Sequence, residues 1–164
     1  MSEQKAFEDA NGRYAAKFEK GALPMPPGRH VAVVTCMDAR LDPAKFLGLS
    51  EGDAHVIRNA GGRADWSAIR SLAISQELLG TNEVFVIHHT DCGMLTFSNA
   101  DLQERLRKKY RAETSDRDFL PFKDLEESVR DDMRAIRSSS IVSKDAPIHG
   151  YVYDVKTGRL KPVK

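Results

Sequence analysis

The stretch VFVIHHTDCG at residues 84–93 is the part of the chain from which its fold and its chemistry can be worked out. Its four leading apolar residues are typical of a strand that is buried on both faces of a parallel sheet. The strand ends in His88 and His89, and Cys92 follows three residues later. Because imidazole and thiolate groups bind metals, the stretch predicts a chemical site where this strand ends.

A second stretch, VAVVTCMDAR at residues 31–40, has the same design. Its apolar run also ends in a cysteine, Cys36, and Asp38 and Arg40 follow at alternate positions. The chain has two cysteines, and each lies just beyond a predicted core strand. With no sign of secretion, this pattern indicates metal binding or catalysis sooner than a disulfide framework.

Length and composition limit the possible classes. The 164 residues fit a single domain over 1–164, with residues 1–22 as an N-terminal helical arm. The 25 basic and 24 acidic side chains give a net charge of +1, which favours neither nucleic acid nor an anionic membrane as a partner. No apolar run approaches the roughly 20 residues that cross a bilayer, and no secretory signal opens the chain. We therefore expect a cytoplasmic protein that acts on a small molecule.

Hydrophobic periodicity predicts alternating helices and strands. The expected helices span 2–20, 65–79, 98–111 and 121–136, and the expected strands span 30–36, 54–58, 83–89 and 148–155, with a return strand from Leu160. This order predicts an α/β fold with a mostly parallel central sheet flanked by helices. The first helix has a narrow apolar stripe that needs a surface to pack on, in its own domain or in a partner subunit; the stripe is formed by Phe7, Ala10, Tyr14 and Phe18.

Cys36, His89 and Cys92 are the predicted metal ligands. In open parallel sheets, ligands bind beyond the carboxyl ends of the strands, where the strand order reverses. If the two strands are neighbours, two thiolates and one imidazole converge there, a donor set that suits Zn²⁺ and leaves its fourth position open. Neighbouring strand residues point to opposite faces, so His88 is expected to be a packed or hydrogen-bonded histidine behind the sheet. His30, His55 and His149 receive the same structural interpretation.

Asp38 and Arg40 are the predicted catalytic pair. An arginine beside a carboxylate keeps it ionised and can hold it through two hydrogen bonds. An ordinary surface ion pair is the simpler explanation, but it is less favoured next to a metal-binding cysteine. The carboxylate of Asp38 could accept a hydrogen bond from solvent on the metal or could itself occupy the fourth position.

These residues resemble the β-class carbonic anhydrases. The resemblance rests on Cys36-x-Asp38-x-Arg40, on His89-x-x-Cys92-Gly93, and on the loop RNAG at residues 58–61, and it is strongest over roughly residues 25 to 100. It implies Zn²⁺ on Cys36, His89 and Cys92, a catalytic dyad of Asp38 and Arg40, and substrate contacts from Gly93, Ala60 and Gly61. It also implies a homodimer or homotetramer in which the N-terminal helix lies across a neighbouring subunit.

The resemblance leaves two substrate classes open. The first is carbon dioxide, hydrated to bicarbonate and a proton through zinc-bound hydroxide. The second is carbonyl sulfide or carbon disulfide, hydrolysed at the same site to hydrogen sulfide and carbon dioxide. Met94 and Leu95 stand where many members have a second glycine, and such side chains can change which small molecule fits. A zinc-stabilised module without activity and a thiol enzyme using Cys36 or Cys92 are the alternatives from other classes.

Overall fold

The computed structural model describes residues 2–164, so that only Met1 of the predicted single domain lies outside the described residues. The elements follow one another as α1 (Glu3–Ala15), β1 (Val31–Cys36), α2 (Pro43–Leu47), β2 (Ala54–Asn59), η1 (Ala60–Gly62), α3 (Trp66–Glu77), β3 (Glu83–His89), η2 (Gly93–Leu95), α4 (Asn99–Tyr110), α5 (Leu125–Ser138), β4 (Ile148–Tyr153) and β5 (Leu160–Val163). The predicted alternation of strands and helices is confirmed.

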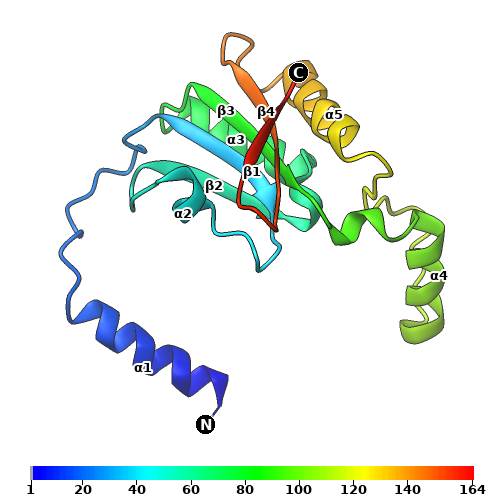
Figure 1. The fold of residues 1–164 in the computed structure, drawn as a ribbon, viewed down its shortest axis with the longest axis horizontal. Helices are drawn as coiled ribbons and strands as arrows, with labels where there is room; N and C mark the ends of the chain where they lie inside the picture. Colours follow the sequence, from blue (N-terminus) through cyan, green and yellow to red (C-terminus); the bar gives the residue numbers. More distant parts are fainter. Residues whose placement is uncertain (1) are drawn as a thin grey trace.

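The five strands form one sheet in the order β2-β1-β3-β4-β5 (Figure 1). The first four are parallel, and β5 pairs antiparallel with β4 as the return strand. From β1 the chain moves to β2 on one side and then to β3 on the other, so the strand order reverses between β1 and β3. Their register pairs Thr35 with Ile87, which brings the carboxyl ends of both strands to the same edge. Ligands gather at such a position in parallel sheets.

Polar caps fix where the helices begin, and one of them explains why the last helix begins later than predicted. Asp42, Asp65 and Ser98 each accept a hydrogen bond from a backbone N–H of the first turn. The last helix was predicted from residue 121 but begins at Leu125, because Asp124 is its cap. The first helix ends at Ala15 and not at residue 20, because residues 16 and 17 form a turn and an extended connector follows.

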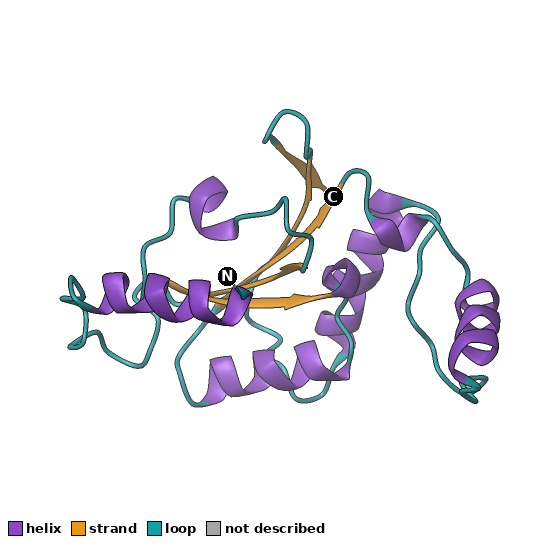
Figure 2. Ribbon diagram, turned by 90° about the horizontal axis from the view of Figure 1, so that it is seen from below, coloured by secondary structure: helices purple, strands orange, loops and turns teal. Residues whose placement is uncertain are grey.

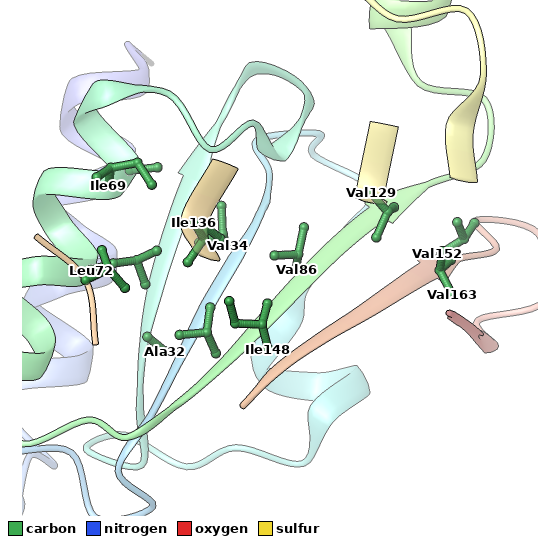
Figure 3. Packing of buried hydrophobic residues seen from close by; sticks show 13 residues of the cluster. Ala32, Val34, Ile69, Leu72, Val86, Val129, Ile136, Ile148, Val152 and Val163 are labelled. Carbon is green, nitrogen blue, oxygen red and sulfur yellow. The ribbon is translucent and has the colours of Figure 1, made fainter. Parts of the chain in front are cut away.

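The hydrophobic core lies between one face of the sheet and helices α3 and α5 (Figures 2 and 3). Alternate residues of the central strands point into it, among them Ala32 and Val34 of β1 and Val84 and Val86 of β3. The other face is also closed around β3, where Ile87 is fully buried. Both central strands are therefore buried on their two faces, as their unbroken apolar runs predict.

Two helices project from this body. In Figure 1, α1 lies below the sheet and α4 lies to its right, and every residue of each helix is at least partly exposed. The rings of Phe7, Tyr14 and Phe18 on the N-terminal arm (residues 2–22) are 69%, 51% and 48% exposed. The arm contacts its own body through Glu51, which binds the Tyr14 hydroxyl and the Lys20 ammonium group. Among residues 2–164, no helix combines the length and the apolar character needed to cross a membrane.

Candidate metal centre

Cys36, His89 and Cys92 meet at the edge where β1 and β3 end. One sulfur from each cysteine and one imidazole nitrogen all lie within 4.8 Å of one another. All three residues are buried, and both cysteines are free thiols. Residues that are far apart in the chain are thus brought together by the pairing of two neighbouring parallel strands, as the sequence predicts.

The imidazole of His89 is oriented as a metal ligand would be. Its Nδ1 lies 2.9 Å from the carbonyl oxygen of Thr90, which accepts a hydrogen bond from the N–H at that nitrogen. Its Nε2 is buried and has no hydrogen-bond partner among residues 2–164. A buried nitrogen with an unused lone pair costs free energy unless something binds it. Two sulfurs beside that nitrogen form a donor set that fits Zn²⁺.

The surroundings of the two cysteines shift their pKa values in opposite directions. The Cys92 thiol, the His89 imidazole and the backbone N–H groups of Asp38 and Gly61 all lie near the sulfur of Cys36. Together these contacts outweigh burial and lower the pKa of Cys36 to about 4. The hydrogen bond to Cys36 raises the pKa of Cys92, and burial raises it further. Burial opposes a charge on His89, but the Cys36 thiolate outweighs burial and raises the pKa of that imidazole.

Asp38 and Arg40 form the predicted pair beside the three ligands. Arg40 donates from its backbone N–H and from Nε to Oδ1 of Asp38, at 2.9 and 3.0 Å, and from a terminal nitrogen to Oδ2 at 2.8 Å. The guanidinium holds the pKa of the Asp38 carboxyl well below its usual range. Oδ2 lies 3.8 Å from Nε2 of His89, so an ionised carboxylate oxygen faces the ligand cluster.

Asp91 and Arg58 belong to the site and were not singled out from the sequence. Arg40 donates to Oδ2 of Asp91 at 2.6 Å and to its carbonyl oxygen at 2.8 Å, so Arg40 bridges both ligand-bearing segments. Asp91 adopts a left-handed backbone with φ of 56°. Arg58 donates to the carbonyl oxygens of Cys36 and Asp38 at 3.0 and 2.8 Å. Its position in the RNAG loop was a signal, but the partners of its side chain were not readable from spacing.

The turn η1 packs closely against Cys36. Asn59 closes this turn, because its side chain accepts from the backbone N–H of Arg63 and donates to the carbonyl oxygen of Arg63, both at 2.7 Å. At Gly62, with φ of 71°, an added Cβ would lie 2.9 Å from the backbone nitrogen of Cys36, so only glycine fits. The N–H of Gly61 contacts the Cys36 sulfur, whereas Ala60 is exposed. Gly93 opens η2 directly after Cys92, with free space beside its Cα.

The other four histidines lie away from the ligand cluster and have polar partners, as predicted. His88 is fully buried on the opposite face of β3, with Nδ1 2.7 Å from the Ser128 hydroxyl. The remaining three have their partners within hydrogen-bond distance: His30 beside the carbonyl of Gly80, His55 beside Ser75, and His149 beside Glu83.

Comparison with known proteins agrees with this geometry. A family model described as carbonic anhydrase matches residues 31–160. The chain is 48% identical to "Beta-carbonic anhydrase 1" of Mycobacterium tuberculosis over 155 residues, which cover 93% of each chain. The chain belongs to the β-carbonic anhydrase family. Among solved structures, carbonic anhydrase from Streptococcus mutans superposes with a TM-score of 0.96 at 48% identity, covering 100% of this chain and 99% of that one.

The β-carbonic anhydrase relatives include proteins with a different substrate in their names. "Carbon disulfide hydrolase" of Acidianus sp. (strain A1-3) is 35% identical over 183 residues, which cover 98% of this chain and 86% of the relative. Membership of the β-carbonic anhydrase family therefore establishes the fold of this chain, and the names of its relatives include two substrate classes.

Proposed function

We propose that this chain is a zinc-dependent carbonic anhydrase that hydrates carbon dioxide to bicarbonate and a proton. The observation that carries the proposal is the unsatisfied Nε2 of buried His89, which lies with two sulfurs and an ionised carboxylate at one sheet edge. Cys36, His89 and Cys92 would hold the ion. Zn²⁺ bound there would make a water molecule acidic enough to supply hydroxide near neutral pH.

Asp38 is proposed as the group that orients the attacking water. Because Arg40 occupies Oδ1 twice and Oδ2 once, the carboxylate is fixed and stays ionised, and Oδ2 keeps a lone pair toward the cluster. An ionised carboxylate only accepts hydrogen bonds, so it fixes the direction of the oxygen that donates to it. Adding one water across a C=O bond of carbon dioxide gives bicarbonate and releases one proton to solvent.

An apolar wall beside the ligands suits a small, linear, uncharged substrate. The two cysteines pack in a cluster with Leu41, Met94 and Phe122. Apolar side chains there exclude bulk water and offer no hydrogen bond that a charged substrate would need. We propose that Gly93, Ala60 and Gly61 also face the substrate; in this structure the N–H of Gly61 is already directed at Cys36.

Carbonyl sulfide or carbon disulfide hydrolysis is the second candidate. Similarity to a carbon disulfide hydrolase supports it, as do the large side chains of Met94 and Leu95 after Gly93. Hydrolysis of carbonyl sulfide by one water gives carbon dioxide and hydrogen sulfide, and carbon disulfide consumes two waters. Carbon dioxide ranks first because the carbonic anhydrase relative is 48% identical and the carbon disulfide hydrolase is 35% identical.

One side-by-side assay decides between these candidates. Purified protein is given carbon dioxide, with proton release followed by stopped flow, and then carbonyl sulfide and carbon disulfide, with sulfide release measured. We expect hydration of carbon dioxide to dominate, to be lost after zinc is chelated, and to return when zinc is added. Sulfide release without hydration would establish the second candidate. Activity that survives chelation and is abolished by alkylation would indicate a thiol enzyme, and no activity on any gas would indicate a non-enzymatic zinc module.

We further propose a homodimer or homotetramer in which the N-terminal arm covers a neighbouring subunit. The exposed rings of Phe7, Tyr14 and Phe18 support this, because they make an apolar surface without a partner in one chain. On this view, residues 1–164 are one domain with 1–22 as its arm. We also propose a cytoplasmic location, because both cysteines must remain reduced. Deleting residues 1–20 should lower the mass of the assembly in sedimentation; an unchanged assembly would refute the role of the arm.

A further inference from the structure

Three buried polar side chains lie behind the metal centre and have no part in the proposed reaction. They are Asp132 of α5, Arg63 beyond η1 and His88 of β3, and they are 4%, 12% and 0% exposed at their side chains. Oδ2 of Asp132 lies 2.8 Å from Nε of Arg63 and 3.0 Å from Nε2 of His88. We refer to these three residues as the buried triad. Burying charged groups costs free energy, so their presence suggests that they have a structural or functional role.

The buried triad is fixed on the side of α5. His88 is within 2.7 Å of the Ser128 hydroxyl, which itself donates to the carbonyl oxygen of Leu125 at 2.7 Å. The ring of Phe122 stacks on the imidazole of His88, with centroids 5.5 Å apart, and lies 5.5 Å from the Arg63 guanidinium carbon. Tight packing leaves the triad side chains little freedom to move independently.

On its other side the buried triad holds the turn η1. Oδ1 of Asp132 accepts from the backbone N–H of Ala64 at 3.0 Å, directly after the turn. Nε2 of His88 lies 3.2 Å from the carbonyl oxygen of Gly62. The backbone N–H and carbonyl oxygen of Arg63 are both hydrogen-bonded to the side chain of Asn59. The turn is therefore held by His88 at Gly62, by Asn59 at Arg63 and by Asp132 at Ala64. The side chains of His88 and Arg63 also lie against the Asp132 carboxylate.

The η1 turn also lies against Cys36, one of the predicted metal ligands. Gly62 fits so closely against the backbone of Thr35 and Cys36 that no Cβ could be added, and the backbone N–H of Gly61 lies near the Cys36 sulfur. A rigid N–H donor fixes where a thiolate sits and how strongly it donates its electrons, and neighbouring groups of this kind orient metal ligands. A displacement of the turn would therefore reach Cys36 first.

We infer that Asp132 is a positioning residue for the metal centre, acting through Arg63, His88 and the η1 turn on Cys36. The inference rests on the proposed metal site but not on the proposed reaction. A helix that contributes no ligand would thus set the geometry of one ligand from behind the sheet.

The test compares two neighbouring aspartates of α5. Asp132→Asn keeps an acceptor for Ala64 and removes the charge that faces Arg63. Asp131→Asn is the matched control, because Asp131 is exposed and pairs with Arg134 at the surface. The first readout is amide hydrogen exchange over residues 59–64 in metal-free protein. We expect exchange there to rise about ten-fold or more in Asp132→Asn, with β3 and α5 changing less, and to stay unchanged in Asp131→Asn.

The second readout is the sulfur-to-metal charge-transfer band of the cobalt-loaded protein. A weakened N–H contact makes the Cys36 sulfur a better electron donor, so the band should move to longer wavelength in Asp132→Asn and not in the control. Arg63→Lys keeps the positive charge but loses the planar guanidinium group. It should produce smaller changes of the same kind, namely faster exchange over residues 59–64 and a shift of the band to longer wavelength. If Asp132→Asn does not fold, Arg63→Lys decides by the same readouts.

Two results would overturn the inference. One is unchanged exchange over residues 59–64 together with an unmoved band. The other is exchange that rises equally across the turn, β3 and α5, because Asp132 would then support general stability only. Neither result depends on whether the protein hydrates carbon dioxide, so failure of the proposed function and failure of this inference remain distinguishable.

Discussion

His88 and His89 are adjacent, equally buried and belong to the same strand, yet their surroundings differ completely. Each nitrogen of His88 has a hydrogen-bond partner, Ser128 at Nδ1 and the Gly62 carbonyl at Nε2, and Nε2 also lies 3.0 Å from Oδ2 of Asp132. His89 uses Nδ1 on the backbone of Thr90, and its Nε2 has no partner among residues 2–164. The contrast separates a histidine that is hydrogen-bonded at both nitrogens from one whose Nε2 is free to bind a metal.

The comparison teaches that bonding, and not burial, distinguishes the two roles. The alternation of a strand sends neighbouring side chains to opposite faces, so one histidine meets a helix and the other meets two cysteines. A buried polar atom without a hydrogen-bond partner is uncommon in folded proteins, and at Nε2 of His89 it coincides with two neighbouring sulfurs, which together suit a metal. Each prediction below attempts to break or sharpen this difference.

Removing the imidazole of His89 should have the largest effect. We expect His89→Asn to lower zinc affinity and turnover by more than about a hundred-fold, because loss of a group that merely orients a ligand already costs 10- to 100-fold. Metal analysis after dialysis and the hydration assay measure both quantities. His88→Asn is the matched control and should retain zinc. Stoichiometric zinc in His89→Asn would break the comparison.

Replacing the carboxylate that faces His89 should act on turnover without acting on the metal. Asp38→Asn keeps the size of the side chain but can no longer be held as an anion by Arg40. We expect kcat/KM to fall about a hundred-fold with zinc content unchanged, since positioned acid–base groups contribute at least that much. An unaltered rate in fully zinc-loaded Asp38→Asn would remove Asp38 from the mechanism.

The central strands and the ligand cluster could be predicted from the sequence because their signals are local. The apolar runs before Cys36 and His89 indicated parallel strands, and the rule that ligands bind at the switch point then placed Cys36, His89 and Cys92 together. The alternation of strand residues also assigned His88 and His89 to opposite faces. Zinc itself and the catalytic roles remain predictions.

The rest of the site depends on contacts between segments that no spacing reveals. Asp91 reaches Arg40 only because its backbone is left-handed, and Asp132 reaches Arg63 across 69 positions of the chain. The start of α5 was placed four residues early, because the apolar spacing that predicted this helix does not mark its first residue, whereas Asp124 provides the actual cap. Such features depend on tertiary geometry, which local sequence patterns describe poorly.

Replacing His88 should cost stability and leave the metal in place. We expect His88→Asn to lower the free energy of unfolding of metal-free protein by about 2 kcal/mol, because Ser128 and Asp132 lose a buried partner. Urea unfolding measures this change, and zinc content and turnover should stay within a few-fold of the original protein. His149→Asn is the control, since His149 lies near the surface beside Glu83. Equal stability of both variants would show that the bonding of His88 is unimportant.

The smallest expected effect concerns the ionisation of one sulfur, that of Cys36, which lies beside His89. The pKa of Cys36 is lowered to about 4, chiefly by the hydrogen bond from Cys92, whose own pKa is raised. A lowered pKa means that the ionised form persists below the usual thiol range of about 8.5. Metal-free folded protein at pH 7 should therefore show the ultraviolet absorbance of one thiolate per chain, which disappears as the pH falls through about 4. Cys36→Ser should lack this signal, and unfolding at pH 7 should abolish it. Absorbance from two thiolates, or from none, would mean that the two sulfurs do not share a proton as the hydrogen bond between them requires.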